Sequence, residues 1–116
     1  MTAELAYRTA AELAAMIRAR SISPTELVQA YLARIDRWDA TLHAYVTVCW
    51  EHALDKARDA EQALARGGPL GPLHGVPFAV KDQFDTAGVR TTSGSRLHAD
   101  RVPAEDATVV ARLRAA

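Results

Sequence analysis

Hydrophobic positions recur at helical spacing in four stretches of this chain. Apolar residues that lie three and four positions apart, with polar residues between them, are typical of helices that bury one face. On this pattern we predict helices at about 9–20, 23–38, 50–66 and 104–115. The first two also begin with the spacing of a capping box, in which a hydroxyl residue, Thr9 or Ser23, precedes a glutamate by three positions.

The hydrophobic pattern changes from helical spacing to alternation just before Lys81. Three large apolar residues are separated there by single residues, and turn-forming glycine and proline precede them: Val76, Phe78 and Val80. This alternation predicts one strong strand at about 75–81 in an otherwise helix-rich chain. It places Lys81 at the end of the strand, on the face opposite to the apolar side chains and next to Asp82.

Composition and charge narrow the classes of function. The chain has 116 residues, enough for one domain with a core, and 14 basic and 14 acidic side chains give a formal net charge of +0. This balance argues against a nucleic-acid or anionic-membrane partner. No stretch resembles a signal peptide or a membrane span, and the single cysteine, Cys49, suits a reducing cytoplasm. The sequence shows no metal-ligand spacing and no phosphate-binding glycine loop, so we predict no metal and no cofactor.

Lys81 is the candidate catalytic residue of the chain. A lysine that is removed from water loses its proton more readily and becomes a usable base. A lysine beside an aspartate at a strand end is also typical of a solvated charge that protects an exposed sheet edge. The residues alone leave both interpretations open.

Two runs around Lys81 carry a family resemblance. They read GPLHGVPFAVKD from Gly71 to Asp82 and GVRTTSGS from Gly88 to Ser95. Without gaps, they resemble the lysine-bearing segment of the amidase signature family, whose members typically read G-P-L-H-G-[IV]-P-x-x-[VI]-K-D followed by G-x-x-T-T-x-G-S. The flanking helical stretches resemble the amino-terminal part of the same family's domain.

The resemblance implies a fold and a chemistry. The fold is an α/β sandwich with a mixed central sheet covered by helices, of which this chain is the amino-terminal part. The chemistry uses a serine nucleophile, a second serine with a cis peptide bond, and a lysine base, and it hydrolyses a small-molecule carboxamide through an acyl-serine. Only the lysine has a counterpart here, Lys81, and both serines are expected beyond Ala116. Ser93 and Ser95 belong to the hydroxyl-rich tail of the motif, whose expected role is to shape the loop beside the site.

Two alternatives stay open beside the hydrolase. The last predicted helix has no stop signal before Ala116, so we expect a truncated part of one amidase domain that is inactive alone. The chain could instead be a stand-alone helical interaction module, whose strand is completed by a partner chain or by another copy. It could also be one component of a tRNA-dependent amidotransferase.

Overall fold

The chain forms two compact units. The computed structural model describes residues 2–116. One unit, which we call the helical unit, contains the chain up to Ala44 together with Trp50–Pro77, and the other, the loop unit, contains Tyr45–Cys49 and Phe78–Ala116. The boundary at Pro77 divides the lysine-bearing motif, whose first part therefore belongs to the helical unit and whose last part belongs to the loop unit.

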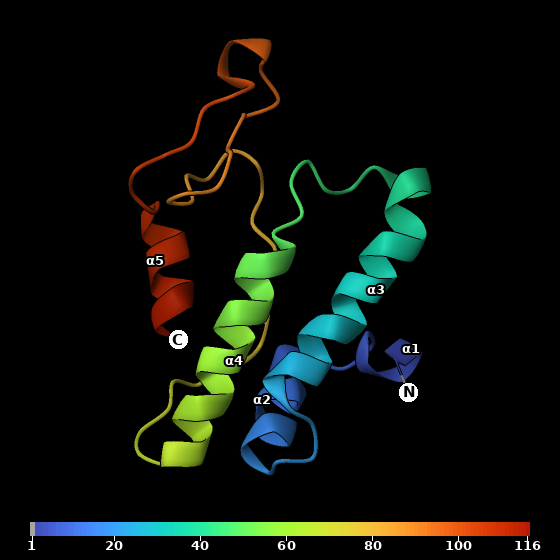
Figure 1. Cartoon of the computed structure of the whole chain (residues 1–116), viewed down its shortest axis with the longest axis vertical. Coiled ribbons are helices and arrows are strands. Elements are labelled where there is room, and N and C mark those ends of the chain that lie inside the picture. Colours follow the sequence, from blue (N-terminus) through green and yellow to red (C-terminus); the bar gives the residue numbers. More distant parts are fainter. Residues whose placement is uncertain (1) are drawn as a thin grey trace. The chain divides into compact units, whose positions relative to one another are not determined.

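The helical unit is built from four helices, two of them long. Their bounds are α1 Thr2–Leu5, α2 Ala10–Arg18, α3 Pro24–Leu42 and α4 Trp50–Arg66. Helices α3 and α4 lie side by side and run in opposite directions (Figure 1). Both predicted capping boxes are present, because Thr9 and Ser23 each accept a hydrogen bond from the third residue of α2 and α3. Helix α3 continues past residue 38, its predicted end, to Leu42, and is capped by His43, which has a φ of 50°.

A small apolar core holds α2 and α3 together. Its buried members are Leu13, Ile17, Ile22 and Leu27, and Val76 packs against them. Just before Val76, the backbone at Gly75 lies close to Pro24 and Ile17. Glycine suits this position because it has no Cβ atom to collide with them and because it readily adopts a φ of 78°. The chain just before the lysine is thus fixed by the core of the helical unit.

The strand predicted at 75–81 is wrong. No strand occurs among residues 2–116, where an isolated bridge between Thr86 and Val89 is the nearest approach to a sheet. Alternation describes a chain that can enter a sheet, but a strand exists only where a neighbouring backbone bonds to it. The apolar Val76 instead serves the helical core, while Phe78 is 45% exposed.

The loop unit consists mainly of turns that precede one helix. A 3-10 turn, η1, spans Arg96–His98, and α5 spans Thr108–Ala115. Helix α5 begins later than the predicted residue 104 because a backbone amide just before it bonds to a distant part of the loop unit. The Ala107 amide donates to the Asp85 carbonyl at 2.8 Å, and Ala107 is extended as the cap of the helix.

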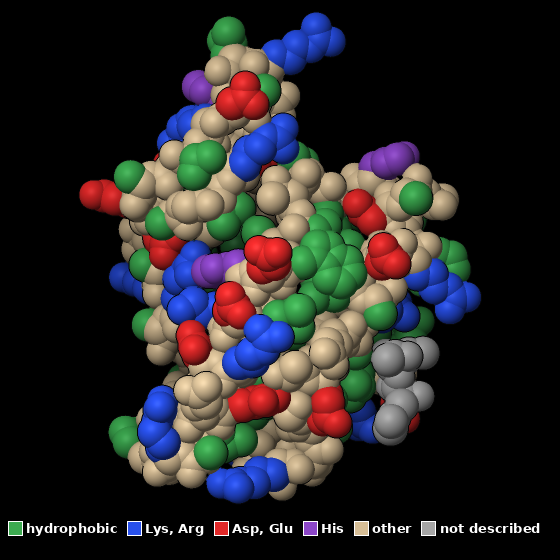
Figure 2. Space-filling model, viewed as in Figure 1, with side chains coloured by type: hydrophobic (Ala, Val, Ile, Leu, Met, Phe, Trp, Pro, Cys, Tyr) green, Lys and Arg blue, Asp and Glu red, His purple; other side chains and the backbone are tan. Residues whose placement is uncertain are grey.

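Charged side chains of both signs cover the exposed face of α4. Figure 2 shows acidic and basic groups interspersed over this helix, and two pairs lie along it: Lys56 with Asp59 at 3.3 Å and Arg58 with Asp55 at 2.8 Å. Pairs of this kind are solvated and contribute little to stability. Among the helices that the structure describes, none combines the length and the apolar composition that a membrane crossing requires.

Candidate functional site

Lys81 occupies the first position of a tight turn in the loop unit. Its carbonyl accepts a hydrogen bond from the Phe84 amide at 3.0 Å, which closes the turn. The side chain is exposed. Within the described part of the chain, no hydrogen bond or ion pair engages its ammonium group, although Asp82 is the next residue. A lysine with no partner is free to meet a group that is brought to it.

Asp82 is bound to the hydroxyl-rich segment rather than to Lys81. One carboxylate oxygen of Asp82 accepts the Thr92 amide at 2.8 Å, and the other accepts the Thr92 hydroxyl. The carbonyl of Asp82 also accepts the Ser93 amide at 2.7 Å. We call this set of three bonds the Asp82–Thr92 clamp. It joins the two halves of the sequence motif through residues that are ten positions apart in the chain.

The clamp depends on an unusual backbone path through residues 91–95. Thr91 and Thr92 are 2% and 5% exposed, so their hydroxyls are inside the unit rather than in water. Ser93 and Gly94 have φ values of 52° and 66°, which turn the chain sharply. The Thr92 hydroxyl also accepts the Gly94 amide at 3.1 Å, and the Ser95 hydroxyl caps η1. Both serines thus lie in the loop that binds Asp82, the residue next to Lys81.

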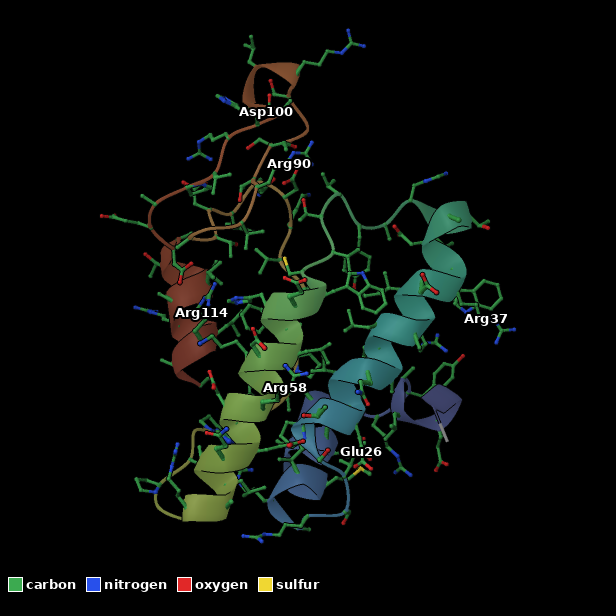
Figure 3. The ribbon with its side chains drawn as sticks, in the orientation of Figure 1. Glu26, Arg37, Arg58, Arg90, Asp100 and Arg114 are labelled. Carbon is green, nitrogen blue, oxygen red and sulfur yellow. The ribbon has the colours of Figure 1, made fainter. Side chains whose placement is uncertain are left out.

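A second set of polar contacts fixes the chain beyond the turn. Arg101 donates two parallel hydrogen bonds of 2.7 Å to the Asp85 carboxylate, a planar arrangement that only arginine provides. Asp106 accepts the Ala87 amide at 2.7 Å and pairs with Arg114 of α5 at 3.0 Å. Figure 3 labels Arg114 on this helix.

Arg90 belongs to the same unit but bonds to backbone rather than to a carboxylate. Its guanidinium donates to the Ala99 carbonyl, on the limb of the chain that returns from η1. Figure 3 shows Arg90 on one of these limbs and Asp100 close to the 3-10 turn η1. The contact holds the two limbs together and leaves the charge of Arg90 available to act on nearby groups.

Hydrogen bonds lower the pKa of two carboxylates in the loop unit. The Thr92 hydroxyl and then the Thr92 amide hold the pKa of Asp82 below its ordinary value; partial burial opposes them, and the Gly94 amide and the charge of Arg90 add to them. The hydrogen bonds from Arg101 likewise lower the pKa of Asp85. Both groups are therefore ionised at neutral pH and are acceptors for the donors that surround them.

This direction of shift predicts how the clamp responds to acid. A carboxylate whose pKa is lower in the folded chain stabilises the fold above its unfolded pKa, about 3.9 for aspartate, and this contribution is lost as the pH falls through the folded value. We expect the protection of the Thr92 amide, meaning how much more slowly it exchanges than in an unfolded chain at the same pH, to fall below about pH 4, as measured by amide hydrogen exchange. In Asp82→Asn the protection of this amide should be low at every pH, because an asparagine side chain has one oxygen and cannot accept both bonds as a carboxylate does. An Asp82→Asn chain that keeps the acid-dependent loosening would assign it to another group.

Sequence patterns identified Lys81 and Asp82 but not the residues that hold them. The motif places two threonines after Lys81, yet the spacing does not show that Thr92 reaches back to Asp82. Nor does it show that Asp85 pairs with Arg101, because the pair is sixteen positions apart. Among the described residues, no group of three or more histidine, cysteine, aspartate or glutamate side chains could hold a metal ion.

Comparison with known proteins gives a consistent result. The family model described as Amidase matches residues 26–116. A glutamyl-tRNA(Gln) amidotransferase subunit from Salinispora tropica is 50% identical over 113 residues, which are 97% of this chain and 23% of that protein. The protein with the same description in Moorella thermoacetica is also 50% identical over 113 residues, with the same coverage. This chain therefore spans about a quarter of the length of these relatives.

Solved structures show the same similarity in three dimensions. A chain from a structure described as a vestigial protein complex that reveals the evolutionary origins of an s-triazine catabolic enzyme superimposes with a TM-score of 0.88 and 32% identity. The superposition covers 93% of this chain and 24% of the other. An inhibitor-bound form of that complex gives the same TM-score, 0.88, at 33% identity, over 94% of this chain and 24% of the other.

Proposed function

This chain belongs to the Amidase family, and from that premise we propose that it is the lysine-bearing part of a hydrolase that cleaves carboxamides. The reaction would convert a small-molecule amide to a carboxylate and ammonia or an amine. Lys81 would be the base that removes a proton, through a bridging serine, from the serine that attacks the amide carbonyl. Both serines would come from polypeptide that is not part of this chain.

One observation carries the proposal. Lys81 lies at the end of a motif shared with the family, in a turn closed by its own carbonyl, and its side chain has no partner among the described residues. A solvated charge that protects a sheet edge is the competing interpretation. No sheet edge occurs among residues 2–116, and the sheet that we expect for the whole domain is completed by other polypeptide, so the support for the chemical role is the motif shared with the family.

The proposal is tested by measuring ammonia release from a panel of simple carboxamides. The 116-residue chain should be inactive, because a base without a nucleophile forms no acyl intermediate. A longer polypeptide in which this chain is followed by the glycine- and serine-rich segment of the family should hydrolyse at least one amide. Absence of activity in both, with each folded, would favour the interaction module.

A second function is favoured by the relatives. Proteins 50% identical to this chain are described as one of the subunits of an amidotransferase that is named for glutamyl-tRNA(Gln). In that case the ammonia released from an amide would pass to a partner chain. The neutral net charge gives no support to direct contact between this chain and tRNA. Amide hydrolysis that rises when a partner chain is added would select this function over a free-standing amidase.

Three finer expectations remain proposals about the whole protein. We expect the chain to form part of one amidase domain, whose mixed central sheet is completed by other polypeptide. We expect the protein to work in the cytoplasm, which its single cysteine favours. The partner that we expect for it is another protein chain, in agreement with the description of the relatives as subunits.

A further inference from the structure

We propose that the Asp82–Thr92 clamp withholds the Asp82 carboxylate from Lys81 and so leaves the lysine amine unpaired. Asp82 would then be a positioning residue that acts through Lys81. The catalytic meaning of this inference rests on the proposed function. Its structural part concerns only residues of the loop unit and can be tested separately.

The geometry leaves the carboxylate little freedom. Both oxygens of Asp82 are engaged by Thr92, one by its amide at 2.8 Å and the other by its hydroxyl. The backbone on either side is fixed as well, because the Lys81 carbonyl accepts the Phe84 amide at 3.0 Å and the Asp82 carbonyl accepts the Ser93 amide at 2.7 Å. Asp82 therefore points into the 92–94 turn while its neighbour remains exposed.

The arrangement matters because adjacent lysine and aspartate residues would ordinarily attract each other. A carboxylate close to an amine favours the protonated, charged form of that amine. A base must be neutral to accept a proton, so an ion pair with Asp82 would hinder Lys81. The Thr92 hydroxyl supplies the carboxylate with an alternative partner that carries no charge.

The other charged groups of the loop unit described above already have partners of their own, so they are not expected to pair with Lys81 in place of Asp82. On the turn side, Asp85 is engaged by Arg101 through two bonds of 2.7 Å. Arg90 acts on Asp82 through its charge while its guanidinium donates to the Ala99 carbonyl. Asp82 is therefore the carboxylate whose release would change the charge next to Lys81.

Three substitutions separate this role from a purely structural one. Thr92→Val keeps the amide and the shape of the side chain but removes the hydroxyl, which frees one oxygen of Asp82. Thr92→Ser retains the hydroxyl and is the matched control. Asp82→Asn removes the negative charge, so it cannot form an ion pair with Lys81 whatever happens to the loop.

The chain provides its own reference for the measurement. It contains two lysines, Lys81 and Lys56, and Lys56 lies on α4 beside Asp59, away from the substituted positions in sequence. Acetic anhydride reacts with neutral amines, and peptide mass spectrometry then gives the ratio of Lys81 to Lys56 acetylation in the 116-residue chain. We expect Thr92→Val to lower this ratio by about two- to fivefold near neutral pH, because the attraction between two charges at the surface is weak. Thr92→Ser should leave it unchanged, and Asp82→Asn should leave it unchanged or raise it.

The double variant decides the mechanism. If the freed carboxylate causes the loss, then Thr92→Val combined with Asp82→Asn should return the ratio to the level of Asp82→Asn alone. An equal loss in the Asp82→Asn background, or no loss in Thr92→Val, would overturn the inference. Because Thr92 is only 5% exposed, Thr92→Ala repeats the measurement with a smaller side chain if valine disturbs folding.

The proposed function and the inference about Asp82 are tested by different measurements, amide hydrolysis for the first and the acetylation ratio for the second. Activity that survives Lys81→Ala in the longer polypeptide would contradict the proposed function and leave the acetylation result standing. An unchanged acetylation ratio in Thr92→Val, together with loss of activity in Lys81→Ala, would overturn the inference about Asp82 alone.

Discussion

Replacement of Lys81 by alanine should abolish amide hydrolysis in a polypeptide that contains this chain and the family's serines. A positioned general base contributes roughly 10²–10⁴-fold to rate, so kcat should fall by about 10³-fold or more. Folding should be almost unaffected, because the side chain is exposed and no described residue bonds to it. Ammonia release and thermal unfolding, measured on the same preparation, test both parts.

Lys56→Ala is the matched control for this prediction. It removes the other lysine of the chain, which is exposed on α4 and pairs with Asp59 at 3.3 Å. Its hydrolysis rate should equal that of the unsubstituted protein. Turnover that persists in Lys81→Ala would exclude Lys81 as the base, and an equal loss in both variants would point to a general effect of charge.

Replacement of Gly75 by alanine should strongly destabilise the helical unit. A Cβ atom built at Gly75 would lie 2.9 Å from Cγ of Pro24 and 3.2 Å from Cδ1 of Ile17, both of which are buried. The φ of 78° adds a conformational cost, because side chains rarely adopt this region. The two effects together should lower the free energy of unfolding by about 2–4 kcal/mol, as measured by urea denaturation followed by circular dichroism.

Gly67→Ala separates the two contributions to that loss. Gly67 has a φ of 74°, close to that of Gly75, but nothing lies within 4 Å of a Cβ atom built there. This variant should lose only the conformational part, about 1–2 kcal/mol. If Gly75→Ala is no worse than Gly67→Ala, the core can shift to accept a methyl group and the close packing is not a constraint.

Local signals in the sequence are sufficient for the helices but not for the strand. The capping boxes at Thr9 and Ser23 act within one turn, so spacing alone identifies them. A strand depends on a neighbour that a hydrophobic pattern cannot supply, so the alternation at 76–80 predicts a strand that does not form. Helix α5 starts later than predicted for a related reason, because the Ala107 amide is bound by Asp85, far away in the sequence.

In the candidate site, too, local sequence identifies some features and contacts between distant residues determine the others. The resemblance to the amidase signature family is confirmed by the family model and by the relatives. The role of Lys81 remains a prediction. Contacts between residues ten or more positions apart, such as Asp82 with Thr92 and Asp85 with Arg101, depend on the path of the loop and could not be predicted from residue types.

The polar construction of the loop unit has a thermal consequence. Its buried residues are few, namely Thr91, Thr92, Pro103 and Val110, whereas the helical unit buries a larger set of aliphatic side chains. Exposure of apolar surface raises the heat capacity on unfolding, and exposure of polar surface lowers it. Most of the heat-capacity change of this chain therefore belongs to the helical unit. The unfolding enthalpy of the loop unit, which contains the clamp, should accordingly vary less with temperature than that of the helical unit.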